Sequence, residues 1–219
     1  NSDKPKGSSK KKSSKKKKAP NKTFAKVKGF FLDERVHKTV GLLLILTSLF
    51  LFIAFTSYLF SWKNDQAYVM DQGFWSFIFS GEEIDIRNWL GKFGAILSHK
   101  MIYGWFGIAS FLIPFNLALW GIRILFKKAL LPLGKTLGIS VISIVWLSIA
   151  LGFAFKPPYD FMGGIFGYQT SEWIKLAIGW VGMLFFILFT ALIAVVILFN
   201  PKIPSFGRVF PKKDEYFAE

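Results

Sequence analysis

The sequence contains no cysteine, only two histidines, and few acidic residues: 13 Asp and Glu stand against 28 Lys and Arg, so the net charge is +15. Without cysteine there is no disulfide framework, thiolate nucleophile or cysteine-bound iron–sulfur cluster. Ionisable residues are also missing from four long runs. Those runs, and not the composition as a whole, indicate the class of protein.

The four runs contain no Asp, Glu, Lys, Arg or His and are 24, 22, 20 and 24 residues long. A helix rises about 1.5 Å per residue, so each run is long enough to cross a hydrocarbon layer of about 30 Å. The sequence therefore predicts an all-α membrane protein with four transmembrane helices. The predicted spans are 39–62, 101–122, 136–155 and 176–199.

The distribution of Lys and Arg predicts the topology. Residues 1–38 carry 14 of them, and the short loop 123–135 carries four. The longer segment 63–100 contains only four Lys and Arg residues, and 156–175 contains two. Positive residues beside spans are retained in the cytoplasm. We therefore expect both termini and loop 123–135 inside, with 63–100 and 156–175 in the periplasm.

The segments outside the spans differ in composition. Residues 1–22 are a Lys/Ser-rich arm, which we expect to be disordered and cytoplasmic because it has too few apolar residues to bury. Residues 23–38 fit either a juxtamembrane amphipathic helix or a flexible link. The membrane domain occupies 39–199, and 200–219 reads as the start of a cytoplasmic linker.

The basic residues near the inner ends of the spans suggest contact with anionic phospholipid, because each can add about 1 kcal/mol of attraction to a negatively charged leaflet. For the amino-terminal arm the alternatives are a pure topology signal and binding to DNA phosphates. The residues expected to face lipid headgroups are Lys26, Lys28, Arg35, Lys38, Arg123, Lys127 and Lys128.

The first outward segment, 63–100, has two halves. The aromatic run 73–79 is compatible with a strand, a membrane-dipping turn or an irregular lid. In the second half, apolar residues recur every three or four positions from Ile86 to Leu97, which predicts an amphipathic helix with Asp85 or Asn88 as its N-cap.

No catalytic, metal or cofactor-binding constellation is expected. Catalysis needs converging titratable groups, and every charged residue lies outside the four runs. The expected topology puts His37 and His99 on opposite sides of the membrane, so they cannot share a metal ion. Polar residues within the spans, such as Asn116 and Ser148, are expected to hydrogen-bond neighbouring helices or their own backbone.

Small residues suggest close packing of helices. Gly134 and Gly138 form one GxxxG pair, and Gly163 and Gly167 form another. In lipid, such spacing lets helix backbones approach closely. The contacts are expected within the four-helix unit or between copies of the chain.

The order and spacing of several motifs resemble the membrane domain of FtsK/SpoIIIE-type bacterial DNA translocases over about residues 36–203. The residues that carry the resemblance are His37 to Leu43, Ser57 and Tyr58, Asn88, Trp89, Leu90 and Gly91 with Gly94 and Ala95, Gly107 to Pro114, Gly121 and Arg123, Gly163, Gly164 and Gly167, and Gly179 to Gly182.

This resemblance implies a role that composition does not reveal. Such domains anchor a cytoplasmic motor at the division septum of the bacterial inner membrane, and help assemble its hexamer. ATP, Mg and DNA are then expected only in a C-terminal motor outside these 219 residues. Other division or envelope proteins are expected partners. The alternatives are a small channel or transporter subunit, and a structural subunit of another envelope machine.

The topology can be tested with a reporter that is active only outside the cytoplasm. We expect no activity from fusions between Lys127 and Lys135, and full activity from fusions between Gln72 and Gly81, because the positive loop stays inside. Activity of the first fusion would refute the predicted orientation.

Overall fold

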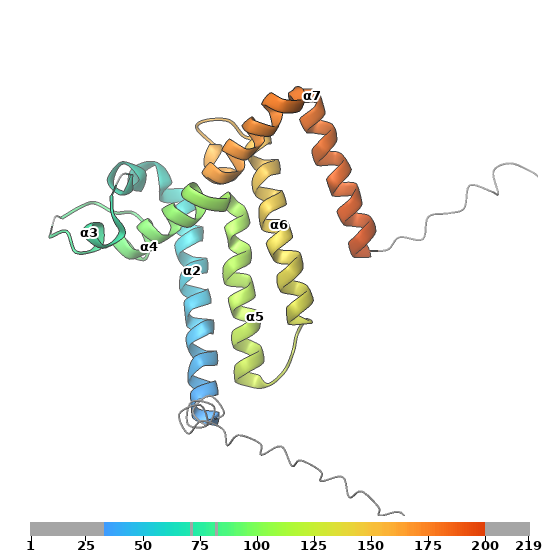
Figure 1. The fold of residues 1–219 in the computed structure, drawn as a ribbon. Helices are drawn as coiled ribbons and strands as arrows, with labels where there is room; N and C mark the ends of the chain where they lie inside the picture. The colour runs from blue at the N-terminus through green and yellow to red at the C-terminus, as the bar shows by residue number, and fades with distance from the viewer. Residues whose placement is uncertain (1–32, 71, 82, 200–219) are drawn as a thin grey trace, which may run out of the picture.

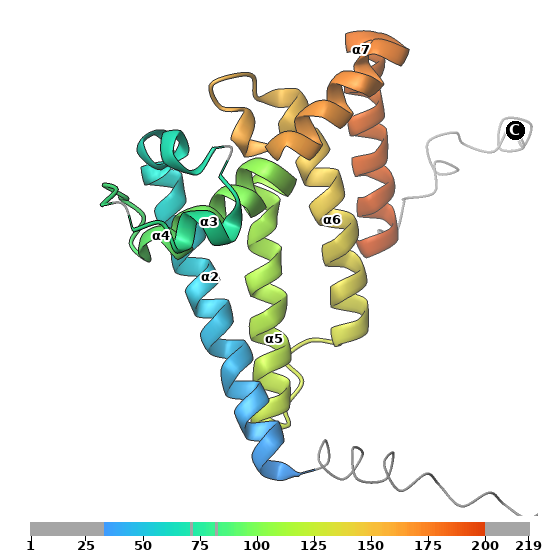
Figure 2. The same cartoon turned by 60° about the vertical axis from the view of Figure 1, so that its left-hand side comes forward.

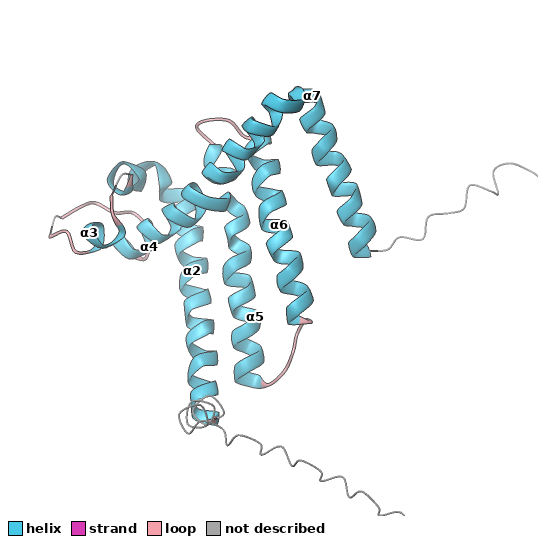
Figure 3. Cartoon of the chain, in the orientation of Figure 1, coloured by secondary structure: helices cyan, strands magenta, loops and turns pink. Residues whose placement is uncertain are grey.

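The computed structural model describes residues 33–70, 72–81 and 83–199, and every regular element among them is a helix (Figures 1 and 3). Four helical regions are long and apolar enough to span a membrane. This confirms the predicted all-α, four-span fold. The arm 1–22, Lys26, Lys28 and the linker 200–219 lie outside the described residues. The four regions are Glu34–Val69, Gly91–Phe126, Leu133–Ala154 and Gly164–Ile197.

The first long helix, α2 (Glu34–Val69), contains the predicted span 39–62 and continues beyond it at the end that the predicted topology places outside, which we call the outer end. Its N-cap is Asp33, whose side chain accepts a hydrogen bond from the Arg35 amide at 2.8 Å. Its 36 residues correspond to about 54 Å, well over the thickness of a hydrocarbon layer. The outer turns of α2 therefore stand beyond the span.

The first outward segment contains two short helices, α3 (Phe74–Ile78) and α4 (Gly91–Ser98). The run 73–79 is therefore mostly helical, and the expected amphipathic helix is present but starts late. Its N-cap position is Leu90, so neither Asp85 nor Asn88 caps it as predicted. The Asn88 side chain instead accepts a hydrogen bond from the Leu90 amide at 3.1 Å.

The second spanning region bends sharply before it descends. From α4 the chain continues through a π-helical segment η1 (His99–Phe106), a 3-10 segment η2 (Gly107–Phe111) and α5 (Leu112–Phe126). Gly107 has φ 64°, a left-handed value that glycine adopts readily, and the chain turns there. Residues 101–106 of the predicted span thus precede the turn, while α5 runs beside α2 (Figure 1).

Close contacts hold α5 against α2. A Cβ atom at Gly41 would lie 2.8 Å from the Leu125 amide nitrogen, and one at Gly121 would lie 2.7 Å from Ile45 Cγ1. Further out, Ser48 Oγ donates to the Pro114 carbonyl at 2.6 Å. Pro114 lies in the first turn of α5, where a missing N–H costs little, and the bend comes at Gly107 and not at the proline.

The second half of the domain consists of α6 (Leu133–Ala154), η3 (Asp160–Met162) and α7 (Gly164–Phe199). Helix α7 begins 12 residues before the predicted span 176–199. Gly179, at φ 76° and ψ 172°, breaks α7 into two parts that meet at an angle (Figure 2). Below the break, Trp146 Nε1 of α6 donates to Thr190 Oγ1 at 2.9 Å.

The main buried core lies toward the outer ends of the spans. It joins α2 to the turn of the second spanning region and to η3, and it positions the groups described next. Its buried members are Leu51, Ala54, Phe55, Tyr58, Ile102 and Phe161.

Candidate functional site

Polar side chains on the outer part of α2 hold the segment that leads into α4. We call Ser57, Ser61 and Asp65 of α2, together with Arg87, Asn88 and Trp89, the outer polar cluster. Ser57 Oγ accepts from the Trp89 amide at 2.9 Å. Asn88 Nδ2 donates to the Ala54 carbonyl at 3.1 Å. Both bonds attach residues of the outward segment directly to α2.

Asp65 completes the outer polar cluster. Asp65 is only 1% exposed. Its carboxylate accepts hydrogen bonds from the Arg87 amide at 2.8 Å and from Ser61 Oγ at 2.7 Å. A buried carboxylate is costly unless it is hydrogen-bonded, and these two donors satisfy both of its oxygens. Asp65 therefore acts as a structural link and not as a free acid.

Sequence reasoning missed Ser61 and Asp65, and it assigned no hydrogen-bonding role to Ser57. Their spacing of four residues places them on one face of a helix, which was a usable signal. It was overlooked because Asp65 falls outside the ionisable-free run 39–62, where we expected α2 to end.

A buried ring cluster lies next to the outer polar cluster. Tyr58 Oη lies 3.3 Å from His99 Nδ1, and the His99 ring stacks on Tyr103 with centroids 4.9 Å apart. Tyr58 also contacts Phe161 of η3 edge-on, at 6.4 Å. These contacts link α2, η1 and η3. His99 is thus a packed core residue.

Five glycines meet where α6, α7 and the turn at the start of η2 cross. We call Gly107, Gly152, Gly163, Gly164 and Gly167 the glycine crossing. A Cβ atom at any of these positions would overlap backbone atoms of a neighbouring segment. Side chains are excluded, so the backbones themselves are in contact.

One hydrogen bond reinforces this contact. Ser148 Oγ of α6 donates to the Gly163 carbonyl at 2.6 Å, and a Cβ at Gly167 would overlap the Ser148 carbonyl. Gly107, Gly163, Gly164 and Gly167, all singled out in the sequence, are therefore brought together here.

Other predicted packing glycines have different surroundings. Nothing lies within 4 Å of a Cβ built at Gly91 or Gly179, and both have positive φ, so their local role is to turn the chain. Gly94 faces the side chains of Asn88 and Leu90, and Gly182 faces Ile178 of its own helix. Gly91, Gly179 and Gly182 thus do not join separate helices in this structure. The pair Gly134 and Gly138 also has open space.

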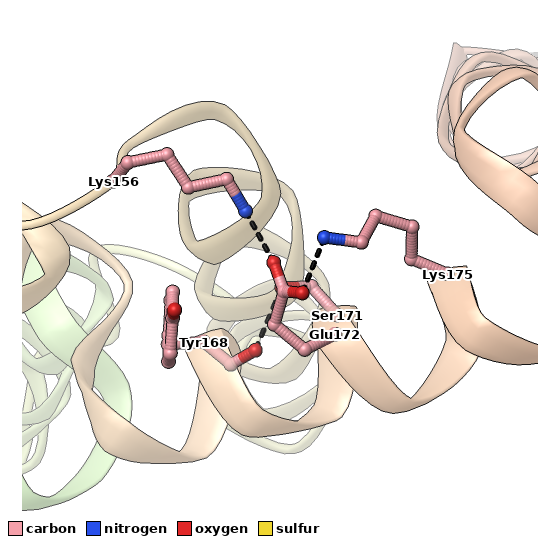
Figure 4. A network of polar contacts seen from close by, with 5 residues as sticks. All are labelled: Lys156, Tyr168, Ser171, Glu172 and Lys175. Atoms are coloured by element: carbon pink, nitrogen blue, oxygen red, sulfur yellow. Dashed lines mark hydrogen bonds and ion pairs between the residues drawn. The ribbon is translucent and has the colours of Figure 1, made fainter.

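A small ionic network connects the outer end of α6 to α7 (Figure 4). Glu172 accepts hydrogen bonds from both Lys156 and Lys175. The Lys156 ammonium also lies 5.4 Å from the centre of the Tyr168 ring. The network ties the loop after α6 to the first part of α7, on the outer side of the glycine crossing.

The inner ends of the spans carry the predicted basic residues that the structure describes. His37, Trp120, Arg123, Lys127 and neighbouring apolar side chains line a shallow pocket of about 430 Å³. Arg35 and Lys38 lie on the first turns of α2, where Lys38 pairs with Glu34 at 3.3 Å, and Lys128 follows the end of α5. Positive charge and apolar surface therefore meet at the inner boundary.

A groove of about 590 Å³ separates the lower parts of α6 and α7. Its walls are almost wholly apolar, and its polar atoms come from Ser143, Trp146 and Thr190. Ions and polar substrates need a polar or hydrated lining. This groove suits hydrocarbon better than an aqueous path.

One comparison with known families matches the chain. Residues 33–209 match the family described as the 4TM region of DNA translocase FtsK/SpoIIIE. The chain belongs to this family. The match covers all four spans, the outer polar cluster and the glycine crossing. Searches of curated proteins and of solved structures found no match.

As an FtsK/SpoIIIE 4TM domain, the chain is a multi-pass membrane domain from a translocase family. Its described residues bring polar groups together to join helices: Asp65, Asn88 and Ser148 each bond to another segment of the chain. These polar groups therefore have a structural role within the domain, at the outer ends of the spans.

The glycine crossing can be tested with two matched substitutions in the 4TM domain. Gly167→Ala should lower the thermal midpoint in detergent, because its methyl group meets the Ser148 carbonyl and overpacking costs about 1–3 kcal/mol. Gly138→Ala lies in open space and should be neutral or stabilising by up to about 1 kcal/mol. Equal midpoints for the two variants would contradict close packing at Gly167.

Proposed function

We propose that this chain is the membrane-anchoring and assembly domain of a septal DNA translocase that acts in cell division and chromosome segregation. The family match over 33–209 is the observation that carries the proposal. The placement of the polar side chains agrees with it, because they connect helices at the outer ends of the spans. The domain would sit in the bacterial inner membrane at the division septum.

In this proposal ATP hydrolysis and DNA transport belong to a C-terminal motor outside these 219 residues. ATP, Mg and duplex DNA are therefore partners of the motor, and the membrane domain contributes position and assembly. A motor of this kind must hold its place while it pulls on DNA. Four spans resist extraction because their apolar surface stays in lipid.

The proposed homo-oligomer, a hexamer by family resemblance, has a candidate contact face on α7. The part of α7 after Gly179 packs little against the rest of the chain. Several of its large apolar side chains are exposed. Lipid or another copy would cover them. The most exposed described residues of this part of α7 are Trp180, Val181, Phe185, Leu188, Phe189, Leu192 and Ile197.

Two further classes of partner belong to the proposal. Anionic phospholipid suits the inner pocket, where Arg123 and Lys127 adjoin the apolar Trp120 side chain. Other division or envelope proteins suit the outward segment, which presents the exposed charges of Glu83 and Asp85 outside the spans. A channel is less well supported, since the groove between α6 and α7 is apolar.

The proposal can be tested in cells with the full-length protein carrying a fluorescent tag. One variant exchanges residues 33–199 for an unrelated four-span domain of the same orientation, which preserves anchoring and removes this particular surface. We expect the native protein to collect at the septum, and the exchanged protein to spread around the membrane and leave chromosomes trapped in the closing septum.

Two outcomes would contradict the proposal. Septal enrichment and chromosome clearance by the exchanged protein would show that any anchor suffices. Co-purification of the native protein with an unrelated envelope machine, without division proteins, would favour the structural-subunit alternative.

A further inference from the structure

A continuous series of aromatic contacts runs sideways from the first span to α3. The Phe50 ring of α2 contacts Phe93 of α4 with centroids 5.5 Å apart, and Phe93 contacts Phe74 at 5.7 Å. Phe74 contacts Trp75 at 5.1 Å, and Trp75 stacks on Phe79 at 5.9 Å. We call these five residues the aromatic ridge. It extends the apolar surface of α2 outward along α3.

The ridge begins well inside the predicted span. Phe50 lies 12 residues before Trp62, the last residue of the ionisable-free run, which is about 18 Å of helix. The hydrogen bond from Asn88 to the Ala54 carbonyl holds Asn88, which precedes α4, beside Ala54. Ala54 lies about 12 Å inward of Trp62 along α2. The helices of the outward segment therefore lie alongside the span and not above it.

Figures 1 and 2 show the same arrangement. In both views α3 and α4 lie beside the outer part of α2, and the outer end of α2 extends past them. The two views differ by a rotation about the vertical axis, so the height of α3 along α2 is the same in each. The ridge therefore lies beside α2 and not beyond its outer end.

Helix α3 has two different faces. Phe77, only 1% exposed, packs in a cluster with Val69, Ala95 and Ile96. Trp75 and Phe79 point away from that cluster and are 67% and 77% exposed. The buried face fixes the orientation of α3, so its two stacked rings project from the side of the domain.

We propose that Trp75 and Phe79 insert into the outer leaflet, at the boundary between headgroups and acyl chains, and that α3 is a lateral lipid anchor of the outward segment. Tryptophan is favoured at this depth because its ring is apolar and its N–H reaches polar groups. Continuity with the lipid-facing side of α2 favours lipid over a protein as the occupant. Insertion would keep residues 80–87 at the membrane surface.

These 219 residues contain no cysteine, so a single introduced cysteine can carry a spin label that measures how deep α3 lies in the membrane. Phe79→Cys carries a spin label on the exposed end of α3, and Glu83→Cys carries the same label on an exposed acidic residue of the following segment. Both proteins are placed in nanodiscs of phosphatidylethanolamine and phosphatidylglycerol, where water-soluble reagents reach both faces. For each spin label, we compare the rate of collision with oxygen, which concentrates in lipid, with the rate of collision with a water-soluble nickel chelate.

We expect the ratio of oxygen to nickel collisions to be several-fold higher at Phe79→Cys than at Glu83→Cys. High access to nickel at position 79 would overturn the proposal, because the ridge would then face water. Exclusion of both reagents would also overturn it, since a protein partner or second copy would then cover the ridge.

A second measurement avoids labelling the stacked pair. Trp75→Phe keeps an aromatic ring, so the difference in fluorescence between it and the native chain reports Trp75 alone. In the same nanodiscs we expect that component to be quenched by lipids brominated near the headgroup and protected from aqueous iodide. Quenching by iodide with no effect of brominated lipid would contradict insertion.

Discussion

The outer half of this domain depends on hydrogen bonds between α2 and the segment that precedes α4. Polar atoms there are shielded from water, so each needs a protein partner, and leaving one unpaired costs about 1–3 kcal/mol. Ser57, Asp65 and the Ala54 carbonyl supply those partners to residues 87–89. Once that segment is fixed, the position of α4 follows, and with it the turn at Gly107 that starts the descent of α5.

The glycine crossing performs the corresponding task for the second pair of helices. In lipid the hydrophobic effect does not distinguish a helix from acyl chains, so association relies on close packing and on hydrogen bonds. Gly152 and Gly167 let α6 and α7 touch through their backbones, and Ser148 adds a bond across the contact. This crossing lies at the outer end of the domain, whereas α2 and α5 approach most closely near their inner ends, at Gly41 and Gly121.

The four-span fold was predictable because the bilayer imposes it on composition: long runs without ionisable residues have few alternatives to a helix in lipid. The first and last residues of the helices were not predictable, because tertiary contacts determine where the helices begin and end. Asp65 is tolerated within α2 only because Arg87 and Ser61 donate to it, and a local pattern does not reveal such a partner. For the same reason Asn88 was taken for a possible helix cap, whereas its side chain accepts from the Leu90 amide and donates to the Ala54 carbonyl of α2.

Hydrogen exchange at single backbone amides tests most directly whether α2 holds the outward segment. In lipid nanodiscs, the amides of Arg87 and Trp89, which donate to Asp65 and Ser57, should exchange at least about tenfold more slowly than that of the exposed Asp85. That ratio corresponds to about 1.4 kcal/mol of protection. Equal exchange at all three positions, after correction for intrinsic rates, would mean that the outward segment moves independently of α2 and would contradict the account.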